Sequence, residues 1–161
     1  MLSLYGCNTG NQSAVEPPPS ELSWNAATII FLRPTGPPAA VKGKLSLDDF
    51  ELGEVFVRRY AEIKVEPGRH NLKFSFPSWA AVQAQTIDLQ CDENVTYYVL
   101  YASELGFGAI LPPPDVVVFS ITSKMQLVPE KYGRDIMSQY ELAFQYGRIK
   151  AEQAAGGDAV R

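Results

Sequence analysis

The chain has 161 residues, of which 46% are hydrophobic and 20% charged, and it contains one histidine and two cysteines. This length suits one domain whose core needs no disulfide or metal to support it. The formal net charge is −4 and the Lys and Arg residues are scattered, which disfavours binding to nucleic acid, so we expect no nucleic-acid partner. A single histidine excludes a site with two or three His ligands within one chain, and we expect neither a metal nor a cofactor.

The first seven residues, MLSLYGC, predict the end of a truncated lipoprotein export signal (residues 1–7). Leu4 stands three positions before Cys7 and Gly6 stands directly before it, as in a bacterial lipobox. Neither Lys nor Arg precedes Cys7, and the apolar stretch is shorter than the roughly 7–15 residues of a complete signal. We therefore expect Cys7 to be the lipidation site and the true start codon to lie upstream. The alternative is the frayed N-terminus of a cytoplasmic protein.

Residues 8–25 predict a disordered, proline-rich tether. The segment is polar, has neither a helical nor a strand period, and carries three consecutive prolines from Pro17 to Pro19. Such a composition cannot bury enough apolar surface to become ordered, and the prolines favour an extended spacer. A lipidated cysteine, a tether and a folded domain together give the layout of a lipoprotein.

Residues 26–128 alternate between apolar and polar positions and predict strands. Strands are expected over 28–34 and over 44–57, the latter with a turn at Asp48-Asp49, and the segment 60–76 is typical of a hairpin around Pro67-Gly68. Further strands are expected over 81–90, 95–102 and 116–122, with a loop over 103–115 because of its glycines and prolines. The fold class is therefore mostly β: an antiparallel β-sandwich or small open barrel of about six to eight strands with one C-terminal helix.

The C-terminal segment, 129–157, has a helical period and predicts a helix packed on the domain, followed by a disordered tail over 158–161. Ile136, Tyr140 and Phe144 recur at intervals of four, and Asp135 is suited to cap a helix over 134–155 that Gly156-Gly157 would end. We expect this helix to cover an edge of the sheet.

The order of these segments resembles a domain-of-unknown-function family of small bacterial lipoprotein-like β-sandwich proteins, with a more distant similarity to PEGA-type envelope modules. The resemblance covers residues 26–122 and departs at Asp48-Asp49, where a glycine is usual, and in a longer loop over 35–43. It implies a β-sandwich in the cell envelope and no known catalytic residues. The matching positions are Arg33-Pro34, Gly53, Pro67-Gly68-x-His70 and Tyr97-Tyr98.

The chain offers few groups for catalysis, and we do not expect an enzyme. His70 follows the Pro67-Gly68 turn and no GxSxG motif occurs, so the three residues are interpreted as a structural turn with His70 bonded to backbone; pH sensing is the alternative. An unrecognised hydrolase would need a pocket holding His70 within hydrogen-bond reach of a Ser or a carboxylate. Cys91 has no basic neighbour and is expected to be a half-buried, inert thiol.

Three aromatic residues are candidates for binding: Trp79, Tyr98 and Tyr101. Adjacent residues of a strand face opposite ways, so one of Tyr97 and Tyr98 is expected in the core and the other can be exposed. The predicted function is a non-enzymatic envelope lipoprotein module with a binding or assembly role, anchored to a membrane through Cys7, with an envelope protein or a glycan as partner. The alternative is a soluble carbohydrate- or peptide-binding β-sandwich that uses an exposed aromatic face. Because Asn8 and not Asp follows Cys7, the lipoprotein resemblance implies the outer membrane, facing the periplasm; the alternative location is cytoplasmic.

Overall fold

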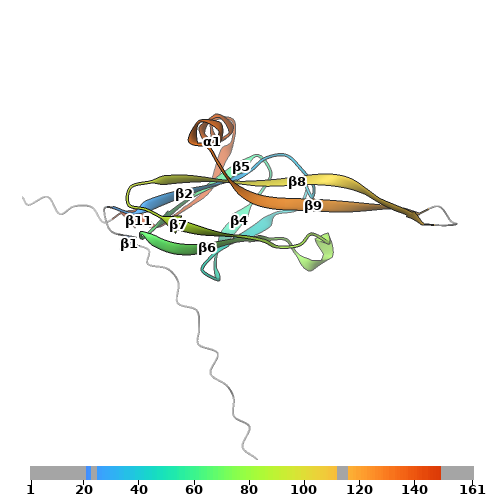
Figure 1. Cartoon of the computed structure of the whole chain (residues 1–161), viewed down its shortest axis with the longest axis horizontal. Helices are drawn as coiled ribbons and strands as arrows, with labels where there is room; N and C mark the ends of the chain where they lie inside the picture. The colour runs from blue at the N-terminus through green and yellow to red at the C-terminus, as the bar shows by residue number, and fades with distance from the viewer. Residues whose placement is uncertain (1–20, 23–24, 112–115, 150–161) are drawn as a thin grey trace, which may run out of the picture.

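The computed structural model describes residues 21–22, 25–111 and 116–149, and it shows two β-sheets packed face to face with one short helix outside them (Figure 1). This arrangement confirms the predicted β-sandwich with a helix near the C-terminus. The five-stranded mixed sheet contains, in spatial order, β10 (Glu141–Tyr146), β5 (Arg59–Val65), β2 (Ala27–Arg33), β8 (Thr96–Leu111) and β9 (Val116–Val128). The four-stranded antiparallel sheet contains β4 (Phe50–Val55), β3 (Gly43–Leu47), β6 (Gly68–Ser75) and β7 (Gln85–Cys91).

The main core lies between the two sheets and is built by the alternation within each strand. Phe31 of β2 contacts Phe74 of β6 with ring centroids 4.8 Å apart, and Phe74 also meets Tyr101 of β8 at 4.8 Å. Both phenylalanines are fully buried. Aromatic pairs at such distances add roughly 0.5–1.5 kcal/mol each to the free energy gained by burial alone.

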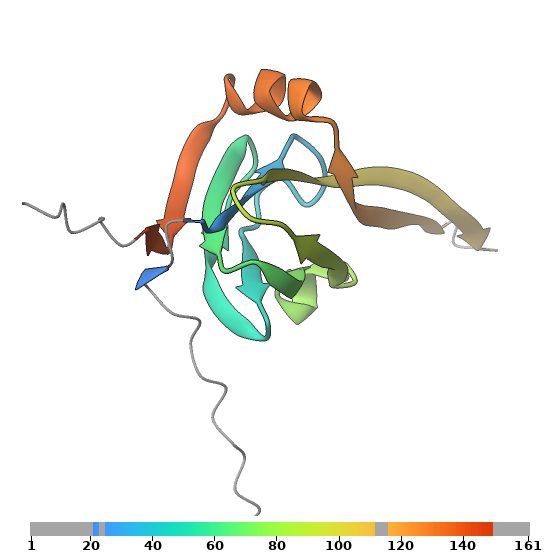
Figure 2. The same cartoon turned by 60° about the vertical axis from the view of Figure 1, so that its left-hand side comes forward.

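A second, smaller core lies on the outer face of the five-stranded sheet, beneath helix α1 (Glu130–Met137) (Figure 2). The helix lays Ile136 and Met137 against the buried residues Ile30, Leu32, Tyr98 and Leu100. Gly133 of α1 is buried directly against the ring of Tyr98. The central strands of this sheet are therefore covered on both faces, which explains their nearly continuous apolar sequence.

The β3–β4 hairpin confirms the turn predicted at Asp48-Asp49. Both residues have positive φ, 49° and 67°, the pattern of a type I′ turn, whose twist matches that of the flanking strands. Aspartate tolerates this left-handed conformation better than most residues. The turn thereby places the carboxylate of Asp48 at one end of the four-stranded sheet.

The segment 60–76 does not form the predicted hairpin. β5 pairs with β2 and β10, whereas β6 pairs with β3 and β7, so the two strands belong to different sheets. The chain crosses from one layer to the other through Glu66 and Pro67. Local alternation and a Pro-Gly turn occur equally in a hairpin and in such a crossover, so the pairing depends on distant strands.

The helix predicted over 134–155 is wrong in extent. Helix α1 ends at Met137, and Glu141–Tyr146 form strand β10, which pairs in parallel with the edge of β5. Leu142, Phe144 and Tyr146 alternate as in a strand, whereas Tyr140 and Phe144 recur at helical spacing, and pairing with β5 decides between the two. The expected protection of a sheet edge is thus supplied by a strand.

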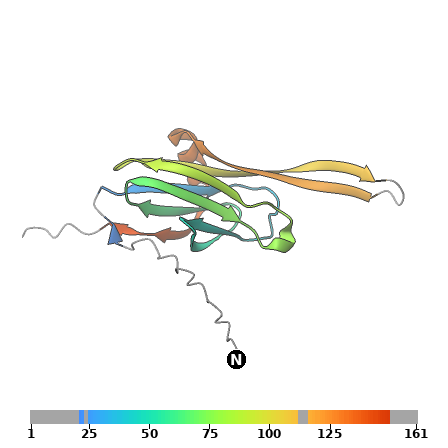
Figure 3. The ribbon, with the colours of Figure 1, turned by 60° about the horizontal axis from the view of Figure 1, so that its bottom comes forward.

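The loop predicted over 103–115 is also wrong for its first part, because β8 continues to Leu111 and pairs with β9. β2 stops pairing with β8 at Leu100, opposite Leu32. Beyond this point residues 103–111 and 116–123 form a two-stranded extension, the β8–β9 ribbon, which projects well past the rest of the sandwich (Figures 1 and 3).

The N-terminal boundary differs slightly from the one predicted. Glu21–Leu22, placed in the expected tether, form β1, which pairs in parallel with β11 (Arg148–Ile149), and Leu22 is buried. Cys7 and the rest of residues 1–20 lie outside the described residues, as do the predicted tail 158–161 and the end of the predicted helix.

Candidate functional site

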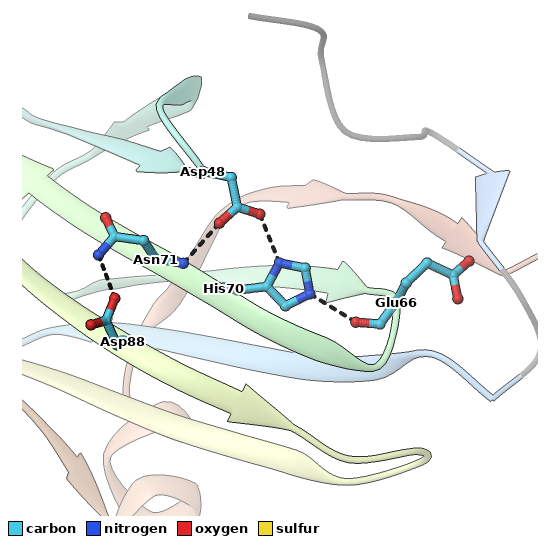
Figure 4. A network of polar contacts seen from close by, with 5 residues as sticks. All are labelled: Asp48, Glu66, His70, Asn71 and Asp88. Carbon is cyan, nitrogen blue, oxygen red and sulfur yellow. Dashed lines mark hydrogen bonds and ion pairs between the residues drawn. The ribbon is translucent and has the colours of Figure 1, made fainter.

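The single histidine lies in a closed polar network at one end of the four-stranded sheet (Figure 4). Nδ1 of His70 lies 2.7 Å from Oδ2 of Asp48, in the β3–β4 turn, and Nε2 lies 2.8 Å from the carbonyl oxygen of Glu66. Both neighbours are hydrogen-bond acceptors, and the tautomer of the ring decides which of them receives its N–H. The ring therefore fastens the β3–β4 turn to the crossover between the sheets.

This geometry meets one requirement of a hydrolase and misses the others. A carboxylate does lie behind Nδ1, but a general base needs its second nitrogen directed at a nucleophile or substrate. In His70 that nitrogen faces the backbone of Glu66, as expected for a structural turn. The side chain is only 16% exposed, and none of the hollows described below is lined by it.

The network continues across the sheet surface towards β7. The backbone N–H of Asn71 donates to Oδ1 of Asp48, and its side-chain amide donates to Asp88. The bond from the Asn71 side-chain amide, and then the contact with Arg69, hold the pKa of Asp88 below its usual value. Together these bonds link β6 to the β3–β4 turn on one side and to β7 on the other.

Cys91, at the end of β7, is buried and is not in a disulfide. Burial, and then the nearby carboxylates of Asp92 and Asp48, raise the pKa of its thiol from 9.0 to about 11. The thiol is therefore protonated at neutral pH and is a poor nucleophile. It is more deeply buried than the sequence predicted.

The three candidate aromatic residues do not form a common surface. Trp79 lies in the short helix η1 (Ser78–Ala80) and is 73% exposed, whereas Tyr98 and Tyr101 are only 4% and 2% exposed. Tyr98 lies under α1 and Tyr101 lies between the sheets. Because both faces of β8 are covered at these positions, the alternation of adjacent residues leaves neither tyrosine for a ligand. Only Trp79 keeps an exposed ring.

An open cleft lies between the segment after η1 and strand β9, beside the base of the ribbon. Its volume is about 550 Å³, and no charged side chain lines it. The lining residues are Ala81, Gln83 and Gln85 on one side and Ser120, Ile121, Thr122 and Ser123 on the other. We call this hollow the β7–β9 cleft; Trp79 lies two residues before its first lining residue.

A second hollow of about 200 Å³ adjoins the same part of β9 and shares Thr122 and Ser123 with the first. Ala102, Glu104 and Lys124 complete its lining. Two hydroxyl groups nearby, those of Tyr101 and Ser123, are buried and lie close to each other. Burial raises the pKa of Tyr101, an effect that the Ser123 hydroxyl and Arg33 partly offset. The base of the ribbon is therefore bordered by two hollows whose lining on β9 is mainly polar.

Arg33, which the sequence marked only as the end of a strand, is a buried structural cation. Nη1 donates to the carbonyl of Val55 at 2.7 Å, and Nη2 donates to the carbonyl of Pro38 at 2.9 Å. Its guanidinium lies 4.8 Å from the ring centroid of Phe76. Desolvation lowers the pKa of Arg33 to about 10, opposed by the nearby Tyr101. A charged residue before a proline at the end of an apolar strand was the one signal that marked it.

The described residues contain no cluster of three or more His, Cys, Asp or Glu side chains suited to a metal ion. Within the same part of the chain, no helix is long and apolar enough to cross a membrane. No family model, curated protein or solved structure matches this chain.

Proposed function

We propose that this protein is a non-enzymatic binding or assembly module of the bacterial envelope, anchored through a lipid on Cys7, whose interaction element is the β8–β9 ribbon. The projection of this ribbon beyond the sandwich is the observation that supports the proposal (Figure 3). A two-stranded ribbon is marginally stable alone in water and gains stability from a further strand or a packed face. A ribbon that extends this far therefore suits contact with another molecule.

The side chains at the base of the ribbon support the same function. Leu105 is 57% exposed although its partner across the ribbon, Ile121, is also apolar. Residues 105–111 and 116–123 include no charged residue. The exposed apolar side chain of Leu105, in a stretch of sequence without charge, is typical of a protein-interaction surface rather than of a solvated loop.

The non-enzymatic part of the proposal rests on the groups that could have reacted. Both nitrogens of His70 are engaged, and the thiol of Cys91 is buried with a raised pKa. Neither lies in the β7–β9 cleft. The cleft offers amides and hydroxyls, which are suited to binding by hydrogen bonds.

The binding role is tested by native gel electrophoresis of a detergent-treated whole-cell lysate, which contains the protein wherever it is located. We expect the wild-type protein in a complex larger than a monomer and expect Leu105→Lys to abolish that complex. Gln90→Lys, an exposed position on β7, is the matched control and should leave the complex intact. A wild-type protein that migrates as a monomer would contradict the proposed binding role.

The anchor is tested separately with the full-length gene product. We expect membrane fractionation that is lost in Cys7→Ser and processing that is blocked by globomycin. Unlipidated protein in the cytosol would contradict the location and leave the binding role to the gel experiment.

Carbohydrate binding in the β7–β9 cleft is the second candidate function, favoured by its uncharged lining and by the exposed ring of Trp79, two residues before Ala81 of that lining. Sugars bind through stacking on aromatic rings and through hydrogen bonds to amides and hydroxyls. A Trp24→Phe variant leaves Trp79 as the single tryptophan, so its fluorescence reports ligand binding near η1, two residues from the cleft lining. A response to soluble glycans that is lost in Gln83→Ala would support this function, and no response across a glycan panel would contradict it.

A further inference from the structure

Strand β9 has a long free edge, and the properties of this edge indicate what kind of partner binds the ribbon. β9 has 13 residues and ends the five-stranded sheet, pairing only with β8 among the described strands. Its outer N–H and C=O groups therefore have no strand paired with them in the described chain, because β7 lies across the β7–β9 cleft and belongs to the other sheet. Unpaired edges of this length are templates for another strand.

The other sheet edges carry more charge than β9. β4 has two glutamates in six residues, β7 has one aspartate in seven and β10 has one glutamate in six, whereas β9 has a single lysine in 13. Charged side chains and bulges are the usual means by which proteins protect an edge. The register shift of the ribbon lies in β8, between Phe107 and Ile110, and leaves the free edge of β9 regular.

The two faces of β9 differ, which limits how a partner strand can pair. Ile121, Ser123 and Met125 lie on the face that continues the main core, opposite Leu105, Ser103 and Tyr101. The polar residues Thr122 and Lys124 lie on the other face and pair with Glu104 and Ala102. A partner must therefore present its own apolar residues on the same face, and it must be nearly uncharged.

We propose that the partner is a second copy of this chain, and that two copies associate by antiparallel pairing of their β9 edges into a four-stranded ribbon. This inference rests on the proposed function of the ribbon. A two-fold axis through β9 makes the contact self-complementary and closes it as a dimer. With the axis at Ser123, Ile121 faces Met125 on the apolar face and Thr122 faces Lys124 on the polar face, so no like charges meet.

The β7–β9 cleft leaves room for the added strand. It runs beside residues 120–123 of β9 and is open to solvent, and Gln83 and Gln85 form its opposite wall. Side-chain amides can donate to or accept from the free backbone groups of a strand seated there. The four-stranded product also meets the strand number that an independently stable sheet requires.

The self-association is tested by sedimentation equilibrium on the full chain carrying Cys7→Ser. We expect a monomer–dimer equilibrium, and we expect Thr122→Lys to raise the dimer dissociation constant at least about tenfold, equivalent to about 1.4 kcal/mol. In the pairing described above, the introduced ammonium group faces Lys124 of the second copy, and like charges opposite each other destabilise a strand pair. Thr96→Lys, at an exposed position of β8 that is opposite the uncharged Thr28 and away from the β9 edge, should leave the dimer unchanged. Wild-type protein that stays monomeric at about 1 mM would overturn the proposal.

A photo-cross-linking residue at Thr122 in living cells separates this proposal from the proposed function. An adduct with the mass of two copies supports self-pairing. An adduct with a different protein overturns self-pairing and leaves the binding role of the ribbon intact. The absence of any adduct contradicts both.

Discussion

Gly133→Ala tests whether helix α1 is held on the sheet through contact with Tyr98. An ideal Cβ at position 133 would lie 2.3 Å from Cδ1, 2.4 Å from Cγ and 2.7 Å from Cβ of Tyr98. Each distance is below any that a real Cβ atom makes. Tyr98 is only 4% exposed and lies among Ile30, Leu32 and Leu100, so its ring has little room to move. The helix itself must shift outward.

Two opposing effects set the size of the change. Replacing glycine by alanine inside a helix gains about 1 kcal/mol from helix propensity. Overpacking a core costs roughly 1–3 kcal/mol, and three simultaneous clashes with a rigid ring place this case at the upper end. The helix has only eight residues and cannot spread the shift along its length. We expect a net loss of about 1–2 kcal/mol in the free energy of unfolding.

Urea unfolding followed by circular dichroism measures this loss, with Lys131→Ala on the exposed part of α1 as the control, expected within about 0.5 kcal/mol of wild type. In a Tyr98→Ala background the contacts with Cδ1 and Cγ are gone and only the contact with Cβ remains, so Gly133→Ala should cost less than in wild type, giving a coupling energy of about 1 kcal/mol. An unchanged or raised stability of Gly133→Ala in the wild-type background would refute the described docking of α1.

Three further predictions concern buried or bonded polar groups. Arg33→Met keeps most of the side-chain volume but leaves the carbonyls of Val55 and Pro38 without their hydrogen-bond donor. We expect urea unfolding to show a loss of about 2 kcal/mol in the free energy of unfolding; equal or higher stability would contradict a bonding role for Arg33. His70→Ala removes the contacts of the ring with Asp48 and with the Glu66 carbonyl and should lower the free energy of unfolding by about 1–3 kcal/mol. His70→Phe keeps a ring but not the hydrogen bonds and should not restore stability. Folding raises the pKa of Cys91 from 9.0 to about 11, so the unfolded chain loses this proton at a lower pH than the folded chain. The contribution of Cys91 to stability is therefore complete below pH 9 and falls as the pH rises to about 11. Urea unfolding at both pH values, with Cys91→Ala as the control that removes this part of the dependence, checks the sign, and a steeper fall in Cys91→Ala would contradict it.

Much of the fold could be predicted from local sequence because several strands carry their own signals. The apolar run of β2 ends at Pro34, and Asp48-Asp49 supply the left-handed turn of the β3–β4 hairpin. In both cases the residues that decide the structure are neighbours in the chain. The chain does bend at Pro67, but the partners of the two flanking strands could not be predicted, because both a hairpin and a crossover satisfy the same local pattern.

The elements that were missed depend on contacts between distant residues. Gly106 and Gly108 weaken the strand signal of β8, and only pairing with β9 keeps the chain extended there. β10 requires the edge of β5, about 80 residues earlier in the chain, to select a strand over a helix. The candidate site was missed for the same reason: the β7–β9 cleft exists only because two edge strands from different sheets lie side by side.

The aromatic residues illustrate the limit of alternation as evidence for exposure. Tyr97 and Tyr98 do face opposite ways, as predicted, with Tyr97 towards the main core and Tyr98 beneath α1. The hydroxyl of Tyr97 donates to Asp92 and tightens the turn that precedes β8. A strand in the middle of a sheet covered on both sides has no solvent face, and the helix that covers the second face comes about 35 residues later in the chain.

The most direct test of the central claim, that the β8–β9 ribbon is the interaction element, is photo-cross-linking from position 105 in the intact envelope. Leu105→p-benzoylphenylalanine places the probe on an exposed residue of the ribbon, and the same substitution at Gln90 places it on an exposed residue of β7. The account predicts a discrete adduct from position 105 and none from position 90. Equal labelling from both positions, or none from position 105, would contradict it.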